Sequence, residues 1–193
     1  MAQRSLQAEH IADLLDRLAL HQRSRQQGDG LNPAQWEALR FLGRANRYSR
    51  NPTALTDFLG TTKGTVSQTL IALERKRLVT REPDRRDRRS IRIELTLAGR
   101  TLLDRDPMQG IAGAAADLPP AAQQALGGAL GTLLAELRRG GGQRSFGICQ
   151  TCRLFCRAGA SVEAGGPHRC GLTHEPLAEA EAQLICAAHE AAA

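Results

Sequence analysis

The spacing of apolar residues predicts a chain that begins with helices. Apolar residues recur at roughly helical intervals from Leu6 to Leu20, and a second helix is expected from the pair Asn32–Pro33 through Leu42. Asparagine followed by proline is typical of a helix start, because the asparagine side chain caps the first turn and proline fits the first helical position. Two further helices are expected at 52–59 and from Thr61 or Thr62 to about residue 77, separated by Gly60.

Two strand-like pieces and two more helices follow. Residues 79–81 form a short candidate strand, and residues 90–95 alternate isoleucine and leucine with charged residues, as a half-buried strand does. A charged turn joins them, a helix capped by Thr96 comes next, and a long helix is expected at 120–139. A small domain cannot bury the apolar faces of the outermost helices. We therefore expect a second copy of the chain to cover them, which predicts a homodimer.

Charge and cysteine usage narrow the class of protein. The formal net charge of +6 favours a polyanionic partner, either nucleic acid or an anionic membrane. No apolar run has the length of a membrane span, and the N-terminus lacks the apolar region of a secretory signal, so we expect a cytoplasmic protein without a membrane partner. All five cysteines follow residue 148, and in a reducing compartment such clusters more often hold metal or do redox chemistry than form disulfides.

The two helices around Gly60 have the proportions of a helix-turn-helix. In the second helix Val66, Leu70 and Leu73 share a face that should pack inward. Short polar side chains and one cation lie on or near the opposite face, at the N-terminal end, and this mixture allows a helix to approach base edges in the major groove. The residues expected there are Thr62, Lys63, Thr65, Gln68 and Thr69.

An arginine-rich run occupies residues 81–92. A charge run alone is most often a solvated turn. Its place between two strands, directly after the candidate reading helix, instead favours a wing whose arginines clamp phosphates or enter the minor groove. The arginines assigned to this role are Arg85, Arg86, Arg88 and Arg89, and Asp84 and Asp87 are expected to orient them.

Together these motifs resemble the MarR family of transcription regulators. The resemblance rests on segments 55–60, 65–70, 73–79, 84–89 and 95–99 and covers roughly the first 140 residues. It implies a dimer whose terminal helices interlock and whose two winged lobes bind a palindromic operator in double-stranded DNA. It also adds Ser67 to the reading helix and makes Asp87 and Arg89 the aspartate–arginine pair of the wing.

The resemblance further implies a small aromatic effector between the dimerisation helices and the winged lobe. Such a ligand would weaken DNA binding by favouring another spacing of the lobes. The side chains available to line that space are Trp36, Tyr48, His10, His21 and Arg47, although a place in the core or on the surface of the dimer helices explains each of them better.

The cysteine-rich tail has the pattern of a metal site. Cys149 and Cys152 form a C-x-x-C pair, which grips one tetrahedral ion from a tight turn, and a second pair further along closes such a site. The spacing to Cys170 is typical of four-cysteine zinc modules, although the second pair is not a C-x-x-C. The expected ligands are Cys149, Cys152, Cys170 and Cys186, with His189 as a substitute for Cys186 and Cys156 as an extra. This set also resembles a C-terminal extension present in a subset of the MarR family.

Three chemistries remain open for these thiols. Zinc is expected first, because a tail with few apolar residues needs the folding energy of a closed site. An iron–sulfur cluster is the alternative, since four thiolates hold either. Free thiols that oxidise to a disulfide come third.

We therefore expect a mainly α protein with a small β-hairpin wing, a winged helix-turn-helix dimer, and a small metal-stabilised C-terminal module. Residues 1–139 form the dimerisation and DNA-binding domain, with the winged-helix core at about 32–97, and residues 140–147 link it to the tail at 148–193. The expected function is a transcription regulator, most simply a repressor, modulated by a small ligand, metal or redox state, and not an enzyme. The alternatives are a thiol- or metal-dependent redox protein using the tail, and an architectural DNA-binding protein with little sequence preference.

Overall fold

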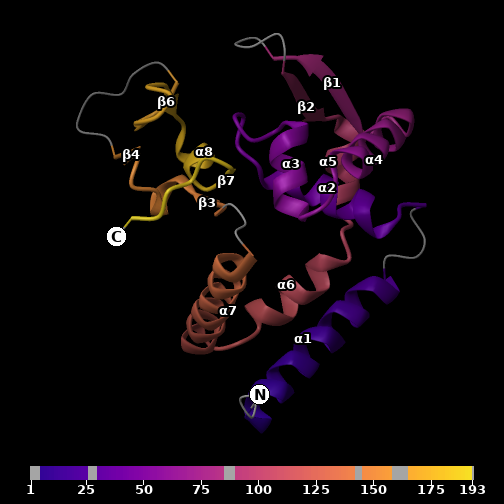
Figure 1. The fold of residues 1–193 in the computed structure, drawn as a ribbon, viewed down its shortest axis with the longest axis vertical. Helices are drawn as coiled ribbons and strands as arrows, with labels where there is room; N and C mark the ends of the chain where they lie inside the picture. The colour runs from indigo at the N-terminus through magenta and orange to yellow at the C-terminus, as the bar shows by residue number, and fades with distance from the viewer. Residues whose placement is uncertain (1–4, 26–29, 85–89, 142–144, 158–164, 193) are drawn as a thin grey trace.

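The computed structural model describes residues 5–25, 30–84, 90–141, 145–157 and 165–192. A compact group of helices and one hairpin, which we call the winged lobe, lies beside a smaller C-terminal module, and three helices extend away from both (Figure 1). The winged lobe consists of α2 (Pro33–Arg44), α3 (Pro52–Leu59), α4 (Lys63–Arg75), β1 (Val79–Pro83), β2 (Ile91–Leu95) and α5 (Leu97–Leu103). The extending helices are α1 (Leu6–Arg25), α6 (Met108–Ala116) and α7 (Pro120–Gly141).

The C-terminal module, residues 145–192, is built from very short elements. Two small antiparallel sheets organise it: β3 pairs with β7, and β5 lies between β4 and β6. Its elements are β3 (Gly147–Ile148), a 3-10 turn η1 (Cys149–Thr151), β4 (Phe155–Cys156), β5 (His168–Cys170), β6 (Pro176–Leu177), α8 (Glu179–Ala182) and β7 (Ile185–Cys186). The described residues thus confirm a mainly helical fold with a β-hairpin wing, and they add small sheets that the sequence did not predict.

Local capping explains where the helices of the winged lobe begin and end. Asn32 caps α2 by accepting a hydrogen bond from the Gln35 amide at 2.9 Å, and Asn51 caps α3 by accepting one from the Ala54 amide at 2.9 Å. Gly60 ends α3 in the left-handed conformation, with φ of 61°, which costs glycine little. These helix boundaries agree with the sequence-based expectation.

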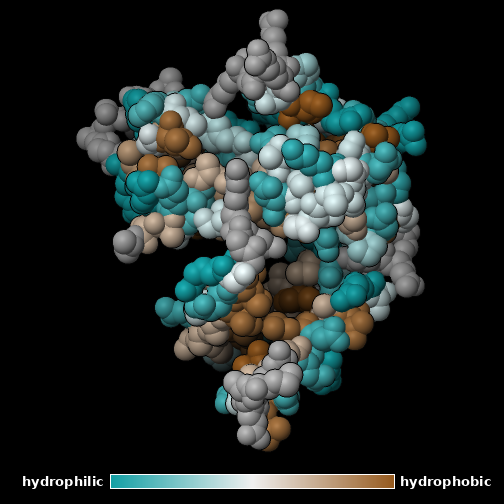
Figure 2. All heavy atoms as spheres, viewed as in Figure 1, coloured by the Kyte–Doolittle hydropathy of each residue, from teal (hydrophilic) through white to brown (hydrophobic). Residues whose placement is uncertain are grey.

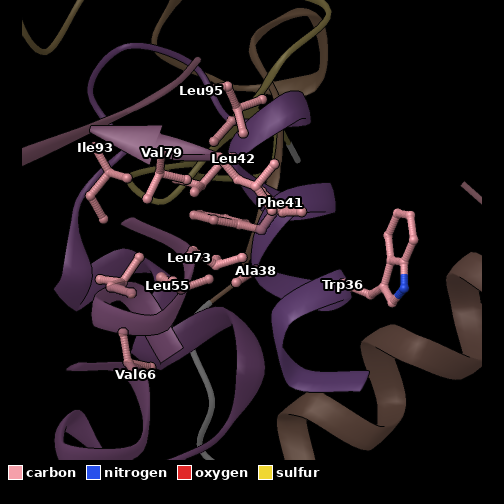
Figure 3. Close-up of a cluster of buried hydrophobic side chains, with 14 of the residues drawn as sticks. Trp36, Ala38, Phe41, Leu42, Leu55, Val66, Leu73, Val79, Ile93 and Leu95 are labelled. Atoms are coloured by element: carbon pink, nitrogen blue, oxygen red, sulfur yellow. The ribbon is translucent and has the colours of Figure 1, made fainter. Parts of the chain in front are cut away.

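One apolar core holds the winged lobe together. Phe41, Leu42, Leu55, Leu73 and Ile93 are all essentially buried and come from α2, α3, α4 and the hairpin (Figure 3). In the hairpin Val79 lies opposite Leu95, so the buried faces of both strands meet the helices. The inward face of α4 predicted from the sequence, Val66, Leu70 and Leu73, is buried in this core.

The C-terminal module packs directly on the winged lobe. Ile185 is part of the lobe's buried core, and the ring of Phe146 meets that of Phe58 edge-on at 5.2 Å between centroids. The segment predicted as a linker therefore contains a core contact, and α7 continues to Gly141, past the predicted end at residue 139. The alanine-rich helix α6 lies between two predicted helices, in a segment to which the sequence pattern assigned no element, because alanine favours helix without creating an amphipathic period.

The helices α1 and α7 leave most of their apolar side chains exposed. Figure 2 shows apolar residues gathered on the part of the molecule that these helices and α6 form. The exposed residues include Ile11, Leu14, Leu18, Leu126, Leu130 and Leu134. Among the described residues, no helix combines the length and the apolar character needed to cross a bilayer.

Candidate functional site

The N-terminal half of α4 presents a polar surface on a firmly held helix. Thr62 caps the helix by accepting a hydrogen bond from the Thr65 amide at 3.1 Å. Thr62, Lys63, Thr65, Ser67 and Gln68 are all exposed, while Val66 between them is buried. All five predicted residues are therefore exposed around the N-terminal end of α4.

Thr69 does not belong to this surface. Its side chain is buried and its hydroxyl donates to the Thr65 carbonyl at 2.9 Å. The expectation that it faces outward was wrong, because it lies three residues after Val66 and four before Leu73, on the face that packs inward.

The hairpin that follows α4 has the place of a wing. The Asp84 amide donates to the Ser90 carbonyl at 2.8 Å, so these two residues extend the pairing of β1 with β2 by one position. The predicted contact residues Arg85, Arg86, Arg88 and Arg89, together with Asp87, lie outside the described residues. Their assignment to DNA remains a prediction.

Two arginines at the base of the hairpin have partners within the protein. The Arg81 Nε donates to Glu74 at 2.9 Å, and the Arg92 Nε donates to Glu94 at 2.6 Å. The ion pair also holds the pKa of the Glu74 carboxyl below its ordinary value, chiefly through the hydrogen bond from Arg81. Arg81 thus ties the hairpin to α4, and Arg92 pairs with a residue of its own strand. The loop arginines are therefore the better candidates for contact with DNA.

The residues considered for an effector site do not come together. Trp36 is buried in the winged lobe, and His10 and His21 are exposed on α1. Arg47 and Tyr48 instead contact the C-terminal module. These five residues therefore lie in separate parts of the described chain, and the aromatic effector remains a prediction.

Arg47 is the centre of a polar contact that the sequence did not predict. Its guanidinium donates to Glu181 at 2.9 Å and to the Pro176 carbonyl at 2.7 Å, both in the C-terminal module. It also donates to the Tyr48 hydroxyl at 2.8 Å, and that hydroxyl donates to Glu175 at 2.9 Å. Although burial opposes the charge, the hydrogen bond to Tyr48 and the two carboxylates leave the pKa of Arg47 above its ordinary value.

All four cysteines predicted as ligands line one small cavity in the C-terminal module. The cavity has a volume of about 40 Å³, and Tyr48 and Leu177 contribute to its otherwise apolar wall. Cys149 is buried, whereas Cys152, Cys170 and Cys186 are half-buried. Burial, with the nearby thiols of Cys186 and Cys170, raises the pKa of Cys149 to about 11.

The two other candidate ligands point to different places. Cys156 is exposed and does not line the cavity. The ring of His189 lies against Gly147, and its Nε2 is 3.0 Å from the Thr151 hydroxyl, with which it shares a hydrogen bond. Within the described residues, no three histidine, cysteine or carboxylate side chains come close enough to hold an ion as they stand, so the metal site remains a prediction.

Residues 29–90, which contain α2, α3, α4 and β1, match the sequence model of the MarR family. No curated protein matches the sequence.

Several solved structures share the fold over about two thirds of this chain. The DNA complex of FabT from Streptococcus pneumoniae is 21% identical, with a TM-score of 0.55, and the match covers 68% of this chain and 94% of FabT. The MepR–DNA complex from Staphylococcus aureus is 19% identical, with a TM-score of 0.55 and coverage of 69% and 96%. A MarR transcriptional regulator from Methanosarcina mazei is 23% identical, with a TM-score of 0.54 and coverage of 68% and 98%.

Proposed function

We propose that this protein is a MarR-type transcription regulator that binds duplex DNA through α4 and the hairpin wing. The observation that carries the proposal is the exposed polar half of α4, which the buried Val66, Leu70 and Leu73 hold against the lobe beside the hairpin. The family model covers this same part of the chain, and two of the structures with the same fold are complexes with DNA.

The residues of this surface have different chemical roles. Lys63, beside the helix N-terminus, provides a cation for a phosphate, where the helix dipole also favours negative charge. Thr65, Ser67 and Gln68 are short or planar polar side chains that reach base edges in a major groove. Arg85, Arg86, Arg88 and Arg89 supply the wing with cations for phosphates or the minor groove.

We infer that two copies of the chain act together. Nearly every side chain of α1 is exposed, although the helix carries a series of leucines and an isoleucine, and α7 exposes leucines in the same way. A helix that buries so little of its apolar face within its own chain needs a partner. Because both helices come from the same chain, a second copy can offer the same two faces in a two-fold arrangement, and this arrangement predicts a palindromic operator.

Binding measurements on paired variants test this division of roles. A duplex selected from a random pool serves as the probe for fluorescence anisotropy at several salt concentrations. Lys63→Ala should weaken binding to selected and unrelated duplexes alike and lower the salt slope by about one unit. Gln68→Ala should cost about 1–3 kcal/mol on the selected duplex and little on unrelated ones.

The exposed Arg153, which pairs with Glu190 in the C-terminal module, provides a matched control for loss of a cation. Arg153→Ala should leave both affinity and salt slope unchanged. Equal effects of Lys63→Ala and Arg153→Ala would show that α4 makes no special contact with DNA.

A further inference from the structure

We propose that Cys149, Cys152, Cys170 and Cys186 form a four-thiolate site for one zinc ion, and that this ion fixes the loop 45–51 in front of α3. The ordering of loop 45–51 by zinc is independent of the proposed function, and only its effect on DNA binding rests on that function.

The short sheets of the module bring the four cysteines together. Cys149 follows β3, and Cys186 lies in β7 directly opposite Gly147 of β3. Cys152 ends the turn η1, where its amide donates to the Cys149 carbonyl at 2.9 Å. Cys170 ends β5, opposite Phe155. Four cysteines from distant parts of the tail therefore face one cavity, while Cys156, on the neighbouring strand, does not.

Two hydrogen-bond donors lie beside the sulfurs of the cavity. Asn46 is buried, and its Oδ1 accepts the Ser49 hydroxyl at 2.7 Å. Its Nδ2 has no conventional hydrogen-bond acceptor in the part of the chain that the structure describes, although the side chain interacts with the Cys149 thiol. The Glu190 amide also donates to the Cys152 sulfur at 3.5 Å. A zinc-bound thiolate would accept a hydrogen bond from each of these two donors. Groups around metal ligands commonly donate such hydrogen bonds.

The cavity has room for a single tetrahedral ion, because its volume of about 40 Å³ exceeds the 10–15 Å³ that one water molecule requires. Closing a four-thiolate zinc site would also supply folding energy to this small module. As they stand, the thiols among the described residues do not form a closed set, so the proposal requires them to rotate about their Cα–Cβ bonds as the ion binds and to release their protons to solvent.

The same loop that touches the site also positions the first helix of the helix-turn-helix. The Asn46 amide donates to the Ile185 carbonyl at 2.8 Å, and the Ala187 amide donates to the Ser49 hydroxyl at 2.8 Å. Asn51, at the end of this loop, caps α3 and donates through its Nδ2 to the Tyr48 carbonyl at 3.0 Å. A zinc ion that orders Cys149 and Cys186 therefore orders the loop from which α3 starts.

Metal content of the full chain tests the site without reference to DNA. Protein purified with and without oxygen is analysed for zinc, iron and sulfide, and the zinc is then replaced by Co²⁺. We expect one zinc per chain and a Co²⁺ spectrum with the charge-transfer bands of four thiolates. Serine at Cys149, Cys152, Cys170 or Cys186 should weaken zinc binding at least 100-fold. Cys156→Ser and His189→Gln should retain both the stoichiometry and the spectrum.

A variant that keeps all four cysteines separates loss of zinc affinity from loss of the ligands themselves. Asn46→Ala leaves all four thiols in place, so its Co²⁺ complex should keep the four-thiolate spectrum while zinc affinity falls about tenfold. An iron–sulfur chromophore, a disulfide between two of the four cysteines in the anaerobic protein, or full zinc binding by all four serine variants would overturn the zinc site.

The effect on DNA is measured separately, by titrating the selected duplex with zinc-loaded and chelator-treated protein. We expect at least a tenfold loss of affinity without zinc, restored by adding Zn²⁺. Unchanged affinity in a protein that binds one zinc would overturn only the link to α3. Absence of DNA binding in zinc-loaded protein would overturn the proposed function and leave the metal site standing.

Discussion

Replacing Ile185 by alanine tests whether the C-terminal module is an integral part of the winged lobe. Ile185 is 7% exposed and belongs to the same buried cluster as Leu39 and Leu42, although it lies far from them in the sequence. Its carbonyl accepts the Asn46 amide at 2.8 Å, so the backbone around it is held by a separate contact. The substitution should therefore remove apolar packing without displacing the segment.

The size of the effect follows from the atoms removed. Isoleucine to alanine deletes three carbon atoms, worth about 2.4 kcal/mol at about 0.8 kcal/mol for each buried methylene. A cavity that the surroundings do not refill adds to this loss, which gives about 2–4 kcal/mol in total. For a chain of this size the melting temperature should fall by on the order of 10 °C.

Trp36 provides the probe, because it is the single tryptophan of the chain and lies fully buried in the winged lobe. Urea unfolding followed by its fluorescence reports the stability of the lobe itself. Ile91→Ala deletes the same atoms from an isoleucine that is 43% exposed, and at the same rate it should cost only about 1.4 kcal/mol. If Ile185→Ala proved no more costly than Ile91→Ala, the module would not share the core of the lobe.

Three further predictions concern the cap of α4, the contact through Arg47 and the dimer. Thr62→Ala should cost about 1 kcal/mol in urea unfolding, because it removes the acceptor of the helix's first turn, and Thr62→Ser should restore it; equal stability of the two variants would argue against the cap. Arg47→Met should weaken docking of the module by about 1–2 kcal/mol, since the hydrogen bonds to Glu181 are partly solvent-screened, and limited proteolysis should then cleave the module faster than in the parent protein. Leu14→Glu and Leu134→Glu should each convert a dimer to a monomer in sedimentation equilibrium, and an unchanged mass in both would contradict the assignment of α1 and α7 to the interface.

Local signals made the winged lobe predictable from the sequence. Asn32 and Asn51 mark helix starts and Gly60 marks a helix end through contacts within a few residues, so a short stretch of sequence specifies each. The alternation at Ile93 and Leu95 likewise defines the buried face of its strand. Thr69 was wrongly predicted to face outward, because its polar side chain was given more weight than its position in the helix. Its spacing from Val66 and Leu73 places it on the inward face, where it is buried.

The sequence singled out the thiols of the C-terminal module but not its structure. The cysteine spacing identified four thiols, and the structure places these four around one cavity. Strands of two or three residues have no measurable periodicity, so the sheets that bring the thiols together were not foreseen. The contacts of Arg47 with Glu181 and of Asn46 with Ile185 join residues far apart in the chain, and no local pattern predicts them.

We propose that two copies of this chain bind a two-fold symmetric site on B-form DNA through α4 and the wing. Footprinting on a duplex selected from a random pool tests this proposal, with the stoichiometry of the complex measured in parallel. We expect two chains per duplex and a symmetric footprint whose half-sites are about one helical turn apart, roughly 10 base pairs. Uniform protection without a preferred sequence, or a single chain on an asymmetric site, would contradict it.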